Sequence, residues 1–379
     1  MKAYKFRIYP SKFQEMQMKE HLWIAKKLWN ELLAYSKEYY QKTAKFPNKT
    51  ELQLLVKGKG LYSQTQQNIA HKVSNTIFRV FKLRKKGIKC GFPRFKSIDR
   101  MKSLLYPQSG FKLEKRLKVT PFGAISIKQH REIEGQIKTL TLKRESSDKW
   151  FAVFCVEQER NEPRQNNGEK VGIDLGLTNL AVLSNGEIIK NPKILNKYGD
   201  KLAMIQKGLS RKKKGSKNRK KAKHKVAVLH EKIANARNDF LHKTSRKLVD
   251  SYSLIALEEL ASQEMSKRMP KKLHLGKYIT DAGWNMFANM ISYKAEEASC
   301  QVVFVDPKNT TQECSNCGTL VKKELDERIH ECPECGLTID RDLNAAKNIL
   351  IRATQGHCES KLLENGTIVQ SMKEEAHTI

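Results

Sequence analysis

Residues 170–186, which read KVGIDLGLTNLAVLSNG, are the stretch around which the rest of the chain is organised. A short apolar run carries Asp174 in its middle, and Gly172 and Gly176 flank this acid. A second apolar run ends at Asn185 and Gly186, which supply the positive φ values that a tight turn needs. The next residues can return as another strand. The stretch therefore predicts a β-hairpin at the start of a sheet.

Asp174 is the chemically informative residue of this stretch. A carboxylate inside a buried strand is costly to desolvate unless a cation neutralises it. Asp174 therefore either faces water at a strand end or holds a metal ion. A solvated acid beside a bend is the simpler interpretation of this stretch alone, but two acid-bearing segments downstream favour the metal.

Composition points to a nucleic-acid partner. The chain has 379 residues, which predicts two or three domains, and its 72 Lys and Arg against 40 Asp and Glu give a net charge of +32. A basic chain without an amphipathic anchor favours nucleic acid over membrane. The longest apolar runs are far below the roughly 20 residues of a membrane-spanning helix. The first residues lack the apolar core of a signal peptide, so we expect a cytoplasmic protein.

The N-terminal region predicts a strand followed by helices. Residues 4–9 alternate polar and apolar side chains, and Pro10 stops the strand. Residues 11–14 fit a capping box that opens a long helix, in which we assign Trp23 and Trp29 to the core rather than to base stacking. Residues 63–66 fit a second capping box. Residues 11 to about 87 are therefore expected to form a small helical unit.

A basic and aromatic segment, GFPRFK, follows at residues 91–96. Arg94 and Lys96 beside phenylalanines suit phosphate contact next to a stacked base. A loop whose aromatic residues anchor it to the core is an equally favoured interpretation. From residue 111 to 157 the pattern changes to short strands, which with the first strand can close a small barrel around the inserted helical unit. Residues 161–168 are typical of a linker.

The most basic segment is residues 211–225, in which ten of fifteen residues are Lys or Arg and none is acidic. Such a run is usually a solvated helix face or a disordered tail. Because it lies between two candidate catalytic segments, we favour non-specific, salt-dependent binding of backbone phosphates. The candidate contacts are Arg211, Lys212, Lys213, Lys214, Lys217, Arg219, Lys220 and Lys221.

Two further acids complete a candidate metal site. Residues 253–260 predict a buried strand that delivers Glu258 at its C-terminal end, and Asp342 lies at the start of a helix after Asp340, which could cap that helix. In a mixed α/β sheet, Asp174, Glu258 and Asp342 can converge. Three carboxylates suit two magnesium ions roughly 3.5–4 Å apart, the arrangement used in phosphodiester cleavage.

Four of the eight cysteines give the sharpest single signal. Cys314 and Cys317 form one Cys-x-x-Cys knuckle, and after fourteen residues Cys332 and Cys335 form another, each followed by glycine. Four thiolates leave no open position on a tetrahedral zinc, so the pattern predicts a structural metal, with redox use as a minor alternative. The other cysteines are interpreted as free thiols.

Several segments together resemble the TnpB family, whose members are transposon-encoded, compact relatives of the type V CRISPR nucleases. The resemblance rests on residues 172–176, 257–260 and 340–346 and on the four cysteines, in the same order along the chain. It extends to residues 4–10, 91–96 and 237–243, and so spans nearly the whole sequence.

This resemblance implies an RNA-guided, magnesium-dependent DNA endonuclease with a RuvC-like, RNase H-type domain. Asp174, Glu258 and Asp342 would be its catalytic metal-binding triad, with Glu259 a second choice for the middle position. A guide RNA and target DNA would be the partners, and pairing between them would supply sequence choice. The alternatives are a guide-independent, transposase-like strand-transfer enzyme and a non-catalytic, zinc-ribbon nucleic-acid-binding regulator.

The expected multidomain α/β architecture divides the chain as follows. The barrel would comprise residues 1–10 and 100–160, and a helical recognition lobe residues 11–99. The nuclease domain would comprise residues 168–306 and 339–355, with the zinc ribbon at 307–338 and a flexible tail at 356–379.

Overall fold

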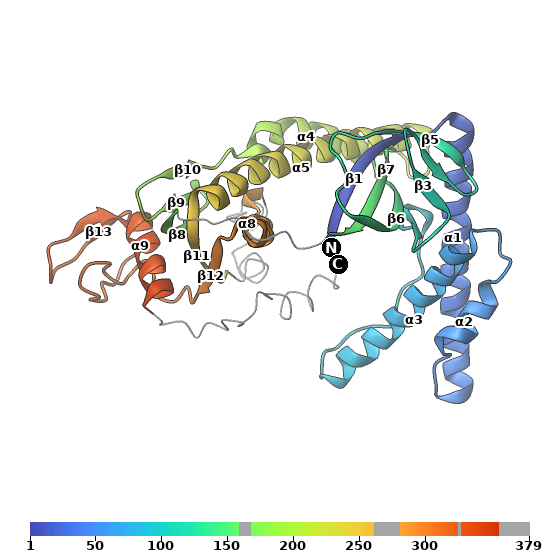
Figure 1. The fold of residues 1–379 in the computed structure, drawn as a ribbon, viewed down its shortest axis with the longest axis horizontal. Helices are drawn as coiled ribbons and strands as arrows, with labels where there is room; N and C mark the ends of the chain where they lie inside the picture. Colours follow the sequence, from blue (N-terminus) through green and yellow to red (C-terminus); the bar gives the residue numbers. More distant parts are fainter. Residues whose placement is uncertain (159–167, 261–280, 325–326, 356–379) are drawn as a thin grey trace. The chain divides into compact units, whose positions relative to one another are not determined.

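The computed structural model describes residues 1–158, 168–260, 281–324 and 327–355, and it divides into two compact units, Met1–Glu159 and Arg160–Ile379 (Figure 1). The predicted tail and most of the predicted linker lie outside the described residues. Each unit has a hydrophobic core of its own.

A seven-stranded antiparallel sheet, in the order β2-β6-β7-β1-β5-β4-β3, forms the first unit and curls into a near-closed barrel. In β1, alternation buries Tyr4, Phe6 and Ile8 against the core. Near the two edge strands the Tyr106 hydroxyl donates to the Thr120 carbonyl at 2.9 Å. The strands are β1 (Lys2–Tyr9), β2 (Ser103–Tyr106), β3 (Phe111–Leu113), β4 (Leu117–Val119), β5 (Gly123–Lys128), β6 (Gln136–Arg144) and β7 (Trp150–Glu157).

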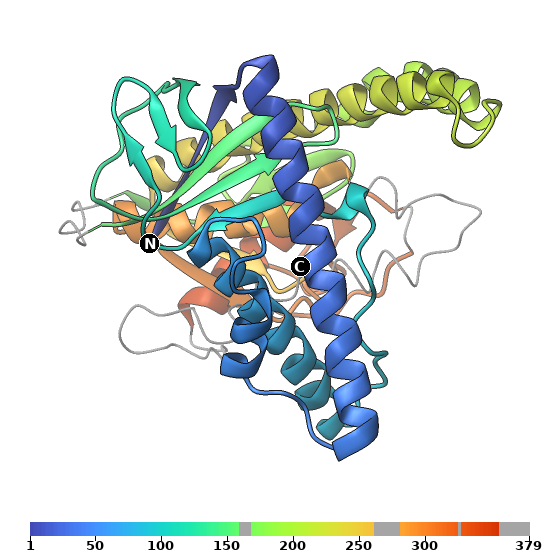
Figure 2. The ribbon, with the colours of Figure 1, turned by 90° about the vertical axis from the view of Figure 1, so that its right-hand side faces the viewer.

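Three helices and a short 3-10 turn are inserted between β1 and β2 (Figure 2). The predicted capping box at Ser11 is confirmed, since Ser11 and Gln14 exchange side-chain to backbone hydrogen bonds. The second capping box is wrong, because Ser63 is already inside its helix and Tyr62 precedes it without a side-chain cap. The elements are α1 (Lys12–Thr43), α2 (Lys49–Val56), α3 (Ser63–Lys85) and η1 (Ile98–Arg100).

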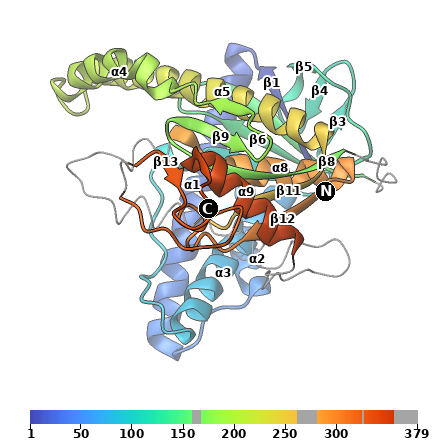
Figure 3. The same ribbon diagram turned by 90° about the vertical axis from the view of Figure 1, so that its left-hand side faces the viewer.

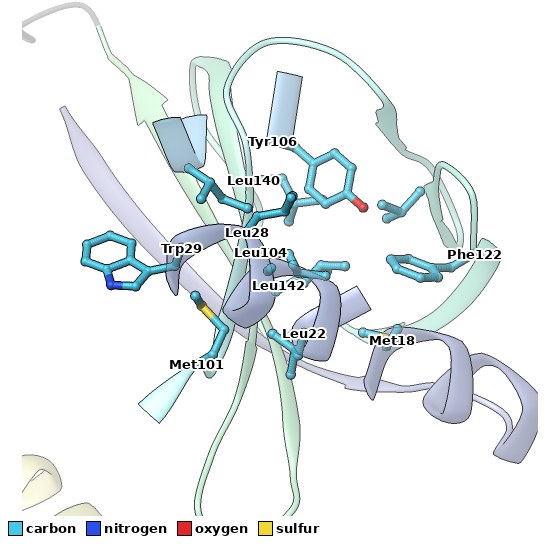
Figure 4. Close-up of a cluster of buried hydrophobic side chains, with 14 of the residues drawn as sticks. Met18, Leu22, Leu28, Trp29, Met101, Leu104, Tyr106, Phe122, Leu140 and Leu142 are labelled. Atoms are coloured by element: carbon cyan, nitrogen blue, oxygen red, sulfur yellow. The ribbon is translucent and has the colours of Figure 1, made fainter. Parts of the chain in front are cut away.

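The two tryptophans of α1 have different environments. Trp29 is 6% exposed and belongs to the core, as predicted (Figure 4). The assignment of Trp23 to the core is wrong, because it is 49% exposed and the ammonium groups of Lys26 and Lys27 lie over its ring. Trp29 follows Trp23 by six residues, which turn an α-helix by about 600°, or about 240° beyond one full turn. The two side chains therefore lie on different faces of α1. Only the face that carries Leu22 and Trp29 meets the core.

A mixed five-stranded sheet, in the order β10-β9-β8-β11-β12, organises the second unit. The first three strands are antiparallel neighbours, whereas β11 is parallel to β8 and β12 is parallel to β11. The predicted hairpin is confirmed, but only Gly186 adopts a positive φ, of 91°, and Asn185 does not. The strands are β8 (Glu169–Leu175), β9 (Asn179–Leu183), β10 (Ile188–Lys190), β11 (Tyr252–Glu258) and β12 (Gln301–Val305).

Helices cover both faces of this sheet (Figure 3). One core joins Ile173 and Leu257 of the strands to Phe287 and Ile291 of α8 and to the C-terminal part of α5. On the other face, Ala256 and Val303 pack against Ile349 of α9. The N-terminal part of α5 pairs with α4 around a small separate core. The helices are α4 (Ile194–Ser210), α5 (Lys217–Ser251), α8 (Trp284–Ala298) and α9 (Arg341–Thr354).

A two-stranded sheet, β13 (Ile329–Glu331) and β14 (Thr338–Asp340), precedes α9 directly. It carries the second cysteine knuckle between its strands. None of the helices in the described ranges is long and apolar enough to cross a membrane.

Candidate metal centres and nucleic-acid interface

Two adjacent parallel strands place Asp174 and Glu258 side by side. In the register of β8 and β11, Gly172 pairs with Ala256 and Ile173 pairs with Leu257. The next residue on each strand is Asp174 or Glu258. Because side chains alternate between the faces of a strand, both acids lie on the face of Gly172 and Ala256, which α9 covers. This register agrees with the predicted convergence of Asp174 and Glu258.

Gly172 sets how closely α9 approaches the sheet. A Cβ atom added there would lie 2.1 Å from the Ala346 carbonyl oxygen and 2.7 Å from the Leu350 nitrogen. Only glycine therefore permits this packing. The close contact brings the first turn of α9, which contains Asp342, to the end of the sheet where Asp174 lies.

The electrostatics of Asp174 connect this carboxylate with the other two acids. Its side chain is partly open to solvent by area, yet the surrounding protein atoms displace much of its water. This burial, followed by the negative charges of Glu258 and Asp342, raises the pKa of Asp174 to about 8. Asp174 therefore interacts through space with Glu258 and with Asp342, although the three acids are not gathered as closely as the cysteine sulfurs.

Glu258 is 9% exposed and is held by Thr310, a residue that sequence reasoning missed. The Thr310 hydroxyl donates to Glu258 Oε1 at 2.5 Å. Burial raises the pKa of Glu258, while this hydrogen bond and the Arg352 guanidinium oppose the rise. Thr310 follows β12 in a loop with no distinguishing motif, so no sequence signal would have found it. Glu259, the second choice, lies outside the strand and is exposed.

Asp340 and Asp342 have different roles at the start of α9. Asp340 caps the helix, since its Oδ1 accepts from the backbone N–H groups of Asp342 and Leu343 at 2.9 and 3.0 Å. The Asp342 carboxylate is instead contacted by Arg341 at 3.3 Å and by Arg328 at 3.8 Å. The capping alternative therefore applies to Asp340 and leaves Asp342 as the acid of the shared site.

The four cysteines converge as the sequence predicted. Their sulfurs lie within 4.8 Å of one another, with Cys314 to Cys335 at 3.6 Å and Cys317 to Cys332 at 3.5 Å. Thiolates about 2.3 Å from one tetrahedral zinc would be about 3.8 Å apart, so this donor set fits that ion. In each knuckle the following glycine has a positive φ, and its N–H donates to the carbonyl of the first cysteine. The cluster therefore suits a structural zinc.

Two asparagines join the first cysteine knuckle to α9. Asn344 Oδ1 accepts from the Ser315 backbone N–H at 3.0 Å, and its amide donates to the Glu313 carbonyl at 2.7 Å. The Asn348 amide donates to the carbonyls of Thr310 and Glu313 at 2.9 and 2.6 Å. The same side chains thus tie the cysteine cluster to the residue that holds Glu258.

The basic run covers the turn between α4 and α5 and the start of α5. Most of its predicted contacts, such as Lys213 and Lys220, are exposed and form no ion pair within the described ranges. Arg219 differs, because its guanidinium donates to the carbonyls of Leu209 and Lys212 at 2.9 Å each. Arg219 therefore stabilises the turn, and the neighbouring lysines present the charge.

Arg94 and Lys96, predicted together, have different surroundings in the first unit. Arg94 is exposed, whereas Lys96 is half-buried with its ammonium 3.2 Å from the centre of the Trp29 ring. The backbone of Lys96 is fixed by Asn30, which accepts from its N–H at 2.8 Å and donates to its carbonyl at 3.0 Å. Of the two phenylalanines, Phe92 packs against the core and Phe95 is 56% exposed, so the interpretation of this segment as a loop anchored by its aromatic residues holds for Phe92.

The fold and the two clusters define a RuvC-like nuclease architecture with a zinc-ribbon-like cysteine cluster. Three family models match, described as "Probable transposase" (OrfB_IS605) at residues 153–269, "Cas12f1-like, TNB domain" at 284–349 and "Helix-turn-helix domain" (HTH_OrfB_IS605) at 1–45. In the structure, residues 1–45 contain a strand followed by one long helix.

The sequence is also similar to "Putative RNA-guided DNA endonuclease InsQ" of Escherichia coli K12, at 31% identity over 98% of this chain and 95% of the relative. The chain belongs to the TnpB/OrfB_IS605 family.

Other relatives show the same affiliation over shorter stretches. A Streptomyces pristinaespiralis protein with the same endonuclease description is 38% identical over 56% of this chain and 52% of its own length. Among solved structures, a Cas12f1 complex with sgRNA and target DNA has a TM-score of 0.55 at 16% identity, covering 89% of this chain and 81% of that one. The predicted fold class is confirmed by this likeness.

Proposed function

We propose that this protein is an RNA-guided, magnesium-dependent DNA endonuclease. The observation that carries the proposal is the placement of Asp174 and Glu258 on neighbouring strands, on the face that is covered by α9 with Asp342 in its first turn. The name of the full-length InsQ relative supports the reaction, and the sgRNA and target DNA of the Cas12f1 complex support the two nucleic-acid partners.

The chain's own residues would divide the work at this site. Asp174 and Glu258 offer oxygens from neighbouring strand ends, and Asp342 offers its carboxylate from the first turn of α9. Hard oxygen donors of this kind suit magnesium.

When bound, magnesium would activate the attacking water and stabilise the leaving oxygen of the phosphodiester. Thr310 would keep Glu258 in position, and Arg341 and Arg328 would hold Asp342 near the end of the sheet. The cysteine cluster would take no part in the chemistry, because four thiolates leave zinc no open position.

The exposed lysines of the basic run would bind backbone phosphates of the guide RNA or the target DNA. Lys213, Lys214, Lys220 and Lys221 form no ion pair with a residue that the structure describes, so their contribution would be strong at low salt and independent of sequence. Guide pairing, rather than side-chain readout, would then select the target.

A cleavage assay tests this proposal. The protein, purified with RNA transcribed from its own genetic locus, is mixed with magnesium and DNA that matches the guide. The wild-type protein should cut the DNA, and Asp174→Asn, which keeps the size of the side chain and removes its charge, should abolish cutting while RNA binding persists.

The alternatives give different results in the same assay. Joining of DNA ends without a guide would instead establish a transposase-like strand-transfer enzyme. Binding without cutting by both wild type and Asp174→Asn would establish a zinc-ribbon regulator, and either result would refute the endonuclease.

A further inference from the structure

A small cavity of about 80 Å³ opens in the first unit between α1, α3 and the segment that leads into β2. We call it the Lys72–Lys96 pocket. Its apolar wall includes Trp29, Met101 and Leu104, which lie together in the core close-up (Figure 4). A single water needs about 10–15 Å³ of such space, so the pocket has room for a group of about five heavy atoms.

All the charged residues that line the pocket are cationic, and Thr65, Asn68 and Ser103 are its neutral polar residues. Lys72, Lys96, Arg100 and Lys102 line it, and no Asp or Glu is among its lining residues. Lys102 donates to the Ser146 hydroxyl at 2.6 Å, which directs its ammonium to a neutral partner. The other three cations form no ion pair with any residue that the structure describes. The pocket therefore concentrates positive charge without compensation from the protein.

Lys96 is held in this unfavourable position by its neighbours. The paired hydrogen bonds to Asn30 fix its backbone, and its ammonium lies over the Trp29 ring. Burial and the charge of Lys72 lower the pKa of Lys96 to about 8. A lysine with a purely structural role would be expected to have an acidic partner, because two close ammonium groups repel each other.

An oxyanion in the pocket would provide the negative charge that the lining residues lack.

We propose that the Lys72–Lys96 pocket binds one phosphate group of a nucleic-acid backbone. Lys72 and Arg100 stand at its exposed rim, and Lys96 reaches the phosphate from the wall. The volume admits a tetrahedral oxyanion and excludes a base. Nucleic acid as the source of the phosphate rests on the proposed function, whereas the capacity to bind an oxyanion does not.

The first experiment measures oxyanion binding without any nucleic acid. The full-length protein is acylated briefly near pH 8, with inorganic phosphate or with sodium chloride at equal ionic strength, and each lysine is quantified by peptide mass spectrometry. Phosphate should slow acylation of Lys96 by about threefold or more, because it stabilises the unreactive ammonium. Lys57, which is exposed and does not line the pocket, should react equally in both salts. If phosphate changes the acylation rates of Lys96 and Lys57 equally, the proposal that the pocket binds an oxyanion is refuted.

The second experiment asks whether nucleic acid supplies the phosphate. Lys96→Gln and Lys72→Gln are compared with Lys57→Gln for binding of the cognate RNA and of RNA-paired DNA, since each variant loses one charge. Each pocket variant should weaken one of these complexes by about tenfold, and the control by less than about twofold. Unchanged melting temperatures would show that the variants fold.

The outcomes separate this inference from the endonuclease proposal. Weaker binding in the pocket variants, together with absent cleavage by wild type, would support the pocket and refute the nuclease. Phosphate protection of Lys96 with no loss of nucleic-acid binding would overturn the assignment to a nucleic-acid phosphate. If the wild-type protein cleaves DNA and the pocket variants bind nucleic acid as well as the control does, the proposed phosphate binding in the pocket is refuted. The endonuclease proposal is then unaffected.

Discussion

At the scale of single residues, Gly172 and Thr310 decide how the acidic site is built. Gly172 lets the backbone of α9 approach β8, and Thr310 fixes the carboxylate of Glu258 through one hydroxyl. Neither residue could bind a metal ion in the way a carboxylate does. The positions of the three acids therefore depend on uncharged neighbours as much as on the acids themselves.

Gly172→Ala should strongly destabilise the second unit. Its methyl group would lie 2.1 Å from the Ala346 carbonyl oxygen, so α9 must shift, at a cost of about 3 kcal/mol or more. Gly199→Ala is the control, because nothing lies within 4 Å of a Cβ there and Gly199 is inside α4. That change should be neutral or stabilise by up to about 1 kcal/mol. Thermal unfolding measures both, and equal melting temperatures would contradict the close contact.

Thr310→Val should raise the magnesium concentration needed for DNA cleavage. Loss of the hydroxyl frees Glu258 Oε1 from its 2.5 Å hydrogen bond, and loss of such supporting contacts typically costs about 10–100-fold in metal affinity or activity. The neighbouring Thr311→Val serves as the control and should stay within about twofold of wild type. A magnesium titration of the cleavage rate makes the comparison, and identical curves for both variants would argue against a positioning role.

The sequence located the acids but not the contacts that hold them. Asp174 and Glu258 could be placed because each follows an apolar run that reads as a strand. Thr310 could not, because it lies in an irregular loop and its partner is distant in sequence. The register between β8 and β11, which brings the first two acids together, is likewise a tertiary property. The catalytic role of the acids remains a prediction.

At the scale of elements, the cysteine knuckles and α9 form a connected structure. Asn344 and Asn348 on α9 bind backbone groups between Thr310 and Ser315, immediately before and inside the first knuckle. A disturbance of the cysteine cluster should therefore reach the start of α9 and the loop that carries Thr310.

Cys332→Ser should lower both the zinc content and the stability of the protein. One zinc per chain is expected for wild type, since four sulfurs form the cluster. Cys90→Ser is the control, because Cys90 lies in the first unit and belongs to no metal cluster among the described residues. Elemental analysis and thermal unfolding provide the readouts. Retention of full zinc by Cys332→Ser would contradict the assignment of this ligand.

Elements were predicted well where sequence periodicity reflects burial. The alternation in β1 and the capping box of α1 were both readable. The predictions were wrong where one local sequence pattern is compatible with more than one structure. Ser63 looked like a cap but lies inside α3, and Trp23 looked like a core residue although the core stripe of α1 passes beside it.

At the scale of the whole molecule, the location of charge matters more than its total. The net charge is +32, but many lysines are already paired with acids along their own helices, such as Lys42 with Glu38 at 2.8 Å. In the basic run, by contrast, Lys213, Lys214, Lys220 and Lys221 are exposed and have no acidic partner among the described residues. We expect these lysines to dominate the salt dependence of nucleic-acid binding.

Two variants with the same net charge test this expectation. One replaces the run lysines Lys213, Lys214, Lys220 and Lys221 with glutamine, and the other replaces the paired lysines Lys19, Lys42, Lys243 and Lys247. The slope of log affinity against log salt for RNA should fall by up to about 3 in the first and by less than about 1 in the second. Equal slopes would show that total charge alone sets the affinity.

The attachment of α9 to β8 also has a consequence for biosynthesis. Asp174 leaves the ribosome early, Glu258 follows, and Asp342 arrives only with the helix that fits onto Gly172. A nascent polypeptide that has not yet exposed this helix lacks the third carboxylate and leaves one face of its sheet uncovered. The order of translation itself thus delays assembly of the three-acid site until α9 has been made.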